Sequence, residues 1–159
     1  MHFARNEMLH LGKKKLAKLL YFVDFTNFEL HSESITKLNY EKWAYGPVPS
    51  NFYEILGRLE ENGVISIEKP KEKFIPETIT ANVDVDYSVF SENEMKVISL
   101  ITERFKSDTA GTIEAIAKQE PPYKMVNDWE SIPYHLAYYR NSFDEMTLDE
   151  NFDTPANRK

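Results

Sequence analysis

The stretch LGKKKLAKLLYFVDFTNF, residues 11–28, decides the fold expected of this sequence. Its apolar residues follow the i, i+3, i+4, i+7 spacing of one helical face, and three phenylalanines widen that face: Leu16, Leu19, Leu20, Val23, Phe22, Phe25 and Phe28. So wide an apolar face needs neighbours on most sides. The sequence therefore predicts a central core helix from Leu11 to Phe28, with Gly12 separating it from a short helix over residues 2–9.

The next elements are a helix and a β-hairpin. Phe52, Ile55, Leu56 and Leu59 share one helical face. Ser50 is expected to cap the start of this third helix, and Gly63 to provide the left-handed residue at its end. Residues 64–79 then alternate in the manner of a hairpin, with Pro70 and Pro76 confined to edge positions or bulges. Residues 35–44 fit either a strand or a short helix.

Two more helices are expected further along. Ser91 and Glu94 form the S-x-x-E pattern of a capping box. A shorter helix, capped within residues 107–109, ends at Pro121 and Pro122, and one last turn or two follow in residues 132–139. The predicted class is α+β, mostly α-helical, with a small hairpin after the third helix. One domain is expected over residues 1–142, followed by an acidic, flexible tail over residues 143–159.

Composition restricts the functional classes. The chain has 159 residues, a net charge of −7 and no cysteine, so disulfides, thiolate metal sites and cysteine nucleophiles are excluded. No signal-peptide pattern begins the sequence, and no apolar run approaches the ~20 residues that cross a bilayer. We expect a cytoplasmic protein without a membrane partner. Lys13, Lys14 and Lys15 are interpreted as a solvated face at the helix start.

Catalytic and metal-binding patterns are missing. The four histidines lie far apart without metal-ligand spacing, and no glycine-rich phosphate loop or G-x-S-x-G motif occurs. Asp84 and Asp86 would share a strand face that could hold a cation, but solvated alternation is the stronger interpretation. We therefore expect no enzyme activity, no catalytic residue, no metal and no cofactor.

The stretch KWAYGPVPS, residues 42–50, predicts a rigid, non-helical corner. Pro47 and Pro49 fix their φ angles, and each restricts the residue before it to extended conformations. The corner either closes the core with its aromatic residues or forms a recognition surface. For the second alternative the partner-binding residues would be Trp43, Tyr45, Gly46, Pro47, Val48 and Pro49.

A nucleic-acid-binding alternative comes from the third helix and the hairpin after it. A helix ending in LEENG, followed by a hairpin with EKPKEK at its tip, is similar to the recognition helix and wing of a winged-helix domain. The charges on this helix argue against DNA binding. Its carboxylates, Glu54, Glu60 and Glu61, would repel phosphates, and Arg58 is the only basic residue among them. We expect no specific DNA binding, and an acidic winged-helix-like transcriptional regulator remains an alternative.

Two blocks of the sequence resemble one known family. LGKKKLAKLLYFVDF resembles the K-L-x-K-L-L-Y-F-x-D-F signature of the SocA-like, or Panacea, antitoxin domain, and SITKLNYEKWAYGPVPS resembles its I-T-x-x-x-Y-x-x-x-x-Y-G-P-V-P stretch. FSENEMKVISLITERF and TIEAIAKQEPPYK resemble later parts, so the likeness covers roughly residues 4–139. In a stretch where the family usually has histidine and tryptophan, this chain has Lys118 and Tyr123, while Glu120 is retained.

The resemblance implies an antitoxin of a bacterial or phage toxin–antitoxin pair. Its partner would be a cognate protein toxin, and an adaptor role would add an AAA+ protease, as in one family member. The proline corner is then a candidate interface, because tryptophan and tyrosine dominate binding hot spots and prolines order a loop in advance. A phage protein that blocks a host factor is a further alternative.

Overall fold

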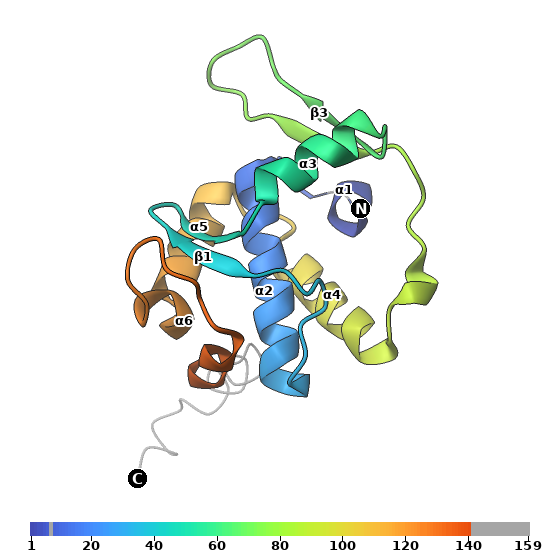
Figure 1. Cartoon of the computed structure of the whole chain (residues 1–159). Helices are drawn as coiled ribbons and strands as arrows, with labels where there is room; N and C mark the ends of the chain where they lie inside the picture. The colour runs from blue at the N-terminus through green and yellow to red at the C-terminus, as the bar shows by residue number, and fades with distance from the viewer. Residues whose placement is uncertain (7, 141–159) are drawn as a thin grey trace, which may run out of the picture.

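The computed structural model describes residues 1–6 and 8–140. Helix α2, Lys13–His31, runs through the middle of the molecule (Figure 1). Other elements pack around it, and residues on all its sides are buried. The predicted central helix is confirmed, although it begins at Lys13 rather than Leu11 and continues past Phe28 to His31, with Gly12 as its N-cap and a left-handed Ser32 after its last residue. The helix expected over residues 2–9 is limited to His2–Arg5. The predicted tail from Phe143 lies outside the described residues.

Short and long helices surround α2. They are α1 (His2–Arg5), α3 (Phe52–Glu61), α4 (Glu92–Phe105), α5 (Ala110–Gln119) and α6 (Pro121–Lys124), with 3-10 turns η1 (Tyr87–Val89) and η2 (Tyr134–Tyr139). Helices α4 and α5, strand β2 (Gly46–Pro49) and η2 contact α2 directly. None of the helices in the described part of the chain is long and apolar enough to cross a membrane.

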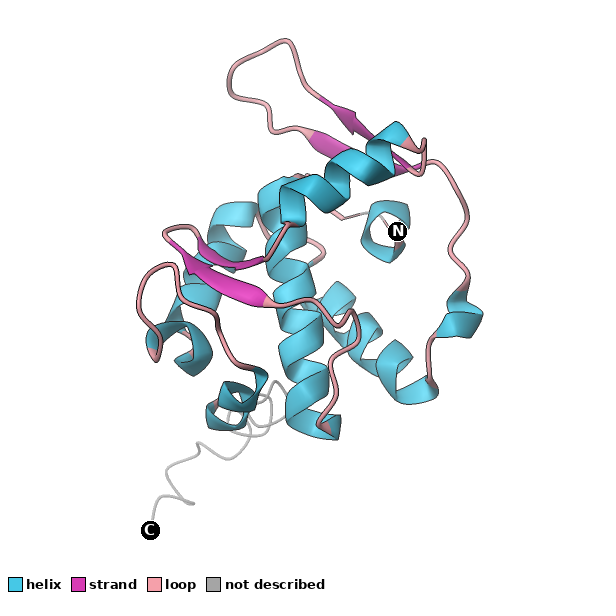
Figure 2. Cartoon of the chain, in the orientation of Figure 1, coloured by secondary structure: helices cyan, strands magenta, loops and turns pink. Residues whose placement is uncertain are grey.

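The fold has two small antiparallel strand pairs (Figure 2). Strand β1, Tyr40–Trp43, pairs with β2, and β3, Ile65–Glu68, pairs with β4, Thr78–Ala81. The second pair is the hairpin expected in residues 64–79, and both of its predicted prolines lie in the connection between the strands. With two strand pairs around a helical core, the α+β class is confirmed.

The proline corner is the second strand of a hairpin. Trp43 pairs with Gly46 across the turn Ala44–Tyr45, and Lys42 pairs with Pro47. Prolines are tolerated here because β2 has a single partner strand, so their missing N–H groups interrupt no second ladder. The extended backbone was predicted, whereas the pairing with β1 was not.

Most of the helix caps predicted from the sequence are present in the structure. The Ser91–Glu94 capping box is present, Thr109 caps α5, and Gly63 has a φ of +68° after α3. The Ser50 cap was wrong. Asn51 occupies the N-cap position without a side-chain bond, and the Ser50 hydroxyl instead donates to Glu41 Oε1 at 3.0 Å.

The interpretation of Lys13, Lys14 and Lys15 as a solvated face was wrong for Lys15. Its side chain is buried, and Nζ donates to the carbonyl oxygens of Leu9 at 2.6 Å and Asp108 at 2.7 Å. A third carbonyl, that of Lys106 after α4, lies at 3.3 Å. The ammonium thus joins the segment before α2 to the residues that follow α4.

Candidate functional site

The six residues predicted to bind a partner divide into two sets. Four of them, Gly46, Pro47, Val48 and Pro49, are buried where β2 packs against α2 and α5. Trp43 is half-buried, and Tyr45 is 56% exposed. Of these six, Trp43 and Tyr45 are therefore the ones that can present side-chain area to another protein.

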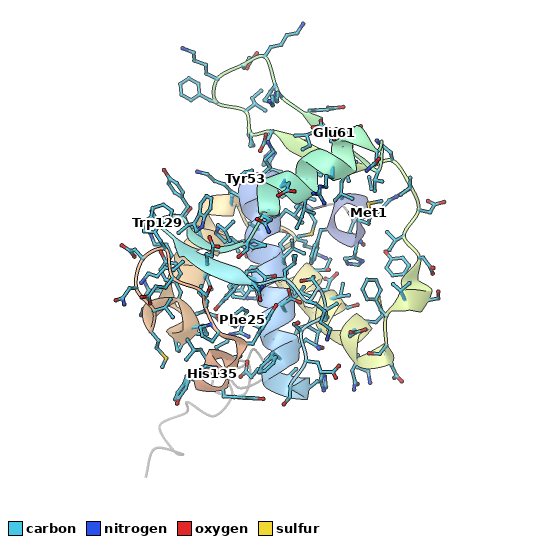
Figure 3. All side chains as sticks on the ribbon, viewed as in Figure 1. Met1, Phe25, Tyr53, Glu61, Trp129 and His135 are labelled. Carbon is cyan, nitrogen blue, oxygen red and sulfur yellow. The ribbon has the colours of Figure 1, made fainter. Side chains whose placement is uncertain are left out.

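Two further aromatic residues lie beside Trp43. Its ring centroid is 5.8 Å from that of Trp129 and 6.1 Å from that of Tyr53. Tyr53 is 51% exposed and Trp129 is 68% exposed, and both lie on the side of the molecule that carries the β1–β2 hairpin (Figure 3). We call Trp43, Tyr45, Tyr53 and Trp129 the aromatic surface. It combines the hairpin, the first turn of α3 and the loop after α6.

The sequence reasoning missed Tyr53 and Trp129. A signal existed for Tyr53, because it points away from the helical face formed by Phe52 and Leu56, which are buried. Trp129 stands in an irregular loop whose position depends on a distant strand. The backbone N–H of Trp129 donates to the Lys42 carbonyl at 2.7 Å, and the backbone N–H of Lys42 donates to the Glu130 carbonyl at 2.9 Å.

Trp129 is held in an unfavourable backbone conformation. Its φ is +69°, in the left-handed region that costs a residue with a Cβ about 1–2 kcal/mol. Burial of the ring does not repay this cost, because most of the side chain is exposed. The hydrogen bonds to β1 impose the conformation instead. A strained residue whose large ring faces solvent marks a candidate functional position.

The hairpin turn is fixed from below by three side chains. Lys118 Nζ donates to the Ala44 carbonyl at 3.1 Å, Tyr123 Oη to the Trp43 carbonyl at 2.7 Å, and Lys18 Nζ to the Pro47 carbonyl at 3.0 Å. Lys118 and Tyr123 are the two residues found in place of the expected histidine and tryptophan. In this chain their contacts support the turn that carries Tyr45.

The two signature blocks bind each other in the core. Asp24 Oδ1 accepts the N–H groups of Ile35 and Thr36, both at 2.8 Å, and Oδ2 accepts the Tyr40 hydroxyl at 2.6 Å and the Thr36 hydroxyl. Burial raises the pKa of Asp24, and these donors oppose that rise. Nearer the start of α2, Lys18 packs against Gly46. These motif residues hold α2 against the β1–β2 segment.

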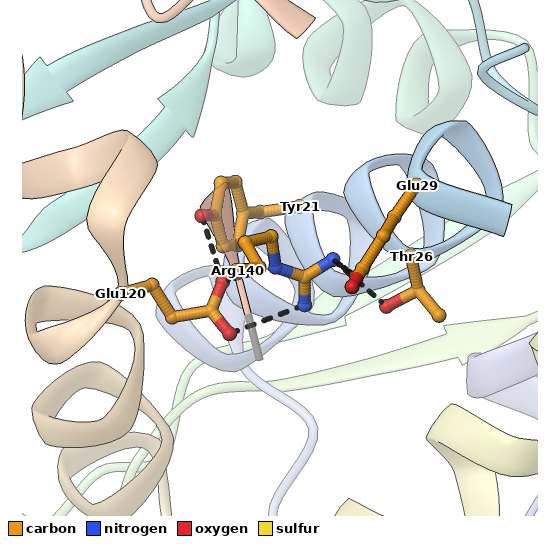
Figure 4. A network of polar contacts seen from close by, with 5 residues as sticks. All are labelled: Tyr21, Thr26, Glu29, Glu120 and Arg140. Atoms are coloured by element: carbon orange, nitrogen blue, oxygen red, sulfur yellow. Dashed lines mark hydrogen bonds and ion pairs between the residues drawn. The ribbon is translucent and has the colours of Figure 1, made fainter. Parts of the chain in front are cut away.

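A buried ionic network closes the far side of α2 (Figure 4). Arg140 donates to Glu120 through Nε at 2.7 Å and Nη2 at 3.1 Å, and Nη1 lies 3.3 Å from Glu29. The Tyr21 hydroxyl donates to Glu120 at 2.9 Å, and burial together with this carboxylate raises the pKa of Tyr21. Nη1 of Arg140 also donates to the Thr26 hydroxyl at 3.2 Å. The network therefore connects α2, the α5–α6 junction and the residue after η2.

The other sequence candidates do not assemble into a site. Asp84 pairs with Arg5 at 2.7 Å, and Asp86 caps η1, so the two carboxylates serve different partners. Residues 1–6 and 8–140 contain no group of three potential metal ligands. A surface hollow of about 430 Å³ beside α4 contains Glu103 and Lys106, which pair with each other at 2.8 Å.

The winged-helix-like arrangement is present only in outline. Helix α3 packs against β3, and the β3–β4 connection projects from the body (Figure 1). The tip carries lysines and a Phe74 that is 98% exposed. Arg58 of α3 is paired with Glu54 at 2.6 Å, which leaves the helix surface acidic.

Comparison with known proteins gives one family. The family model described as "Antitoxin SocA-like, Panacea domain" matches residues 16–124, which include most of the first signature block, the whole of the second, the β1–β2 hairpin and Glu120. Neither the curated proteins nor the solved structures contain a match to the chain.

Proposed function

Because the chain belongs to the SocA-like antitoxin family with a Panacea domain, we propose that it binds and neutralises a cognate protein toxin through the aromatic surface. The family assigns a general antitoxin role, and a toxin is the kind of partner that such a role requires. We further propose that the protein acts in the cytoplasm, without catalysis, in a bacterial or phage toxin–antitoxin pair.

The exposed Trp129 beside Trp43 is the observation that carries this proposal. Large, rigid aromatic side chains at the centre of a surface are the typical anchors of protein interfaces. Their conformations are also fixed in advance, since the loop of Trp129 is bonded to β1 and the turn of Tyr45 is bonded to α5 and α6. Pre-organisation lowers the entropy lost on binding.

Co-expression with the product of a small neighbouring reading frame tests the proposal. We expect the two proteins to co-purify and the chain to rescue growth. Trp129→Ala and Tyr45→Ala should each weaken binding by about 2 kcal/mol, or ~30-fold, with melting temperatures close to wild type. Tyr139→Ala is the matched control, because Tyr139 is 62% exposed but belongs to η2.

Two outcomes would contradict the proposal. Absence of a complex with the wild-type chain would reject the antitoxin role, and equal effects of Trp129→Ala and Tyr139→Ala would reject the aromatic surface. A discrete, competitor-resistant gel shift on the upstream DNA at about 50 mM salt would favour the winged-helix regulator instead. Delivery of the toxin to an AAA+ protease would be recognised by loss of the toxin from protease-competent cells.

A further inference from the structure

Three lysines converge on the turn that carries Tyr45. Lys14 Nζ lies 4.6 Å from the centre of the Tyr45 ring, and Lys118 Nζ lies 3.1 Å from the Ala44 carbonyl. Lys18 lies beneath Gly46, so close that an added Cβ would be 2.8 Å from Lys18 Cε. We call Lys14, Lys18 and Lys118 the lysine group.

The lysine group concentrates positive charge in an acidic chain. Glu114 of α5, 3.9 Å from Lys118, is an acid that faces the group and also favours the charged form of Lys18. Neighbouring charges are paired elsewhere: Lys13 with Glu77, and Lys42 with Asp128. The local excess is thus two positive charges, whereas the whole chain carries −7.

The buried member strengthens this field. Lys18 is buried directly beside Gly46, which belongs to the hairpin that carries Tyr45. Burial, together with the like charges of Lys14 and Lys118, lowers the pKa of Lys18 to about 8, which leaves it mostly protonated near neutral pH. Fixed charges in a desolvated setting interact more strongly than exposed ones.

We propose that the lysine group receives a carboxylate of the bound protein, so that the segment docking on the aromatic surface carries an acidic residue next to apolar or aromatic ones. This inference rests on the proposed function and specifies the chemistry of the partner segment. The turn places the positive group and the Tyr45 ring side by side, and a segment with both features would satisfy both. Lys14 and Lys118 provide the accessible amines, and Lys18 adds its field from below.

Zero-length carbodiimide cross-linking of the complex with the neighbouring gene product tests this chemistry directly. The reagent joins an amine to a carboxylate only where the two are in contact. We expect peptides in which Lys14 or Lys118 is linked to an aspartate, a glutamate or the C-terminus of the partner. Cross-links that involve other lysines alone would overturn the proposal.

Charge reversal provides the second measurement. Lys14→Glu and Lys118→Glu should each slow association on the order of tenfold at about 10 mM salt, and the effect should shrink at about 500 mM salt. Lys96→Glu is the matched control, because Lys96 is exposed on α4 and, like Lys118, pairs with a glutamate four residues earlier. Equal effects of all three variants would overturn the proposal.

The two proposals fail in different ways. If Trp129→Ala weakens binding while the lysine reversals leave it unchanged, the aromatic interface stands and the carboxylate contact is rejected. If the wild-type chain forms no complex, both are rejected.

Discussion

Gly46→Ala is expected to destabilise the chain more than Gly63→Ala, although both glycines have positive φ angles. Gly63 has a φ of +68° and open space around a Cβ, so its replacement costs only the left-handed strain of about 1–2 kcal/mol. Gly46 has a φ of +98°, and its Cβ would also meet Lys18 Cε at 2.8 Å. Lys18 is buried and cannot swing into solvent.

The additional cost follows from the bond that Lys18 would lose. Moving its ammonium away from the Pro47 carbonyl breaks a charged hydrogen bond in a buried setting, which adds about 1.5–3 kcal/mol. The expected loss of unfolding free energy for Gly46→Ala is then roughly 3–5 kcal/mol. Gly57→Ala should have the opposite effect. Gly57 lies within α3 with open space around a Cβ, so the substitution should stabilise the folded protein by about 0.5–1 kcal/mol.

Urea unfolding followed by tryptophan fluorescence measures all three variants. A double-mutant cycle then isolates the contact with Lys18, because in a Lys18→Ala background Gly46→Ala should cost only the left-handed strain. The reasoning is refuted if Gly46→Ala costs no more than Gly63→Ala, or if its cost is the same in both backgrounds.

Two more predictions concern buried charges. Since the pKa of Lys18 falls from 10.5 to about 8 on folding, the unfolded chain binds more protons between these values, and stability rises with pH there. The unfolding free energy of wild type, relative to Lys18→Met, should increase on the order of 2 kcal/mol between about pH 7 and pH 9.5, and a flat difference would contradict the burial of the charge. Glu120→Gln should lower the unfolding free energy by about 3 kcal/mol, because it weakens the charged contacts of the buried Arg140. Glu114→Gln should lower it by ~1 kcal/mol or less, because the ion pair of Glu114 with Lys118 is longer and partly exposed. Equal losses by thermal melting would show that the network of Figure 4 does not hold α2 to the α5–α6 junction.

Sequence reasoning succeeded where the physics is local. The α2 helix, the Ser91–Glu94 capping box and the left-handed Gly63 depend on residues within a few positions of one another. The β3–β4 hairpin is also a local pairing, and its alternation could be read directly.

The errors share a different cause. The burial of Lys15 was not predicted because one of its acceptors, the Asp108 carbonyl, lies beyond α4 and far along the chain. Trp129 was missed because Lys42, far earlier in the chain, fixes its loop. The local sequence around a charged or aromatic residue does not reveal a partner that lies so far along the chain.

The signature residues contact one another inside the protein, and this explains how the resemblance to the family relates to the proposed interface. Asp24 binds Thr36 and Tyr40, and Lys18 binds Pro47, so one half of the signature stabilises the other. Tyr45 is the exposed aromatic residue of these blocks, and its turn is held by Lys118 and Tyr123. Trp129 lies beyond the matched residues altogether. The shared residues thus build a frame for one hairpin. We infer that the choice of toxin depends on the exposed residues around that hairpin, which can change without disturbing the frame.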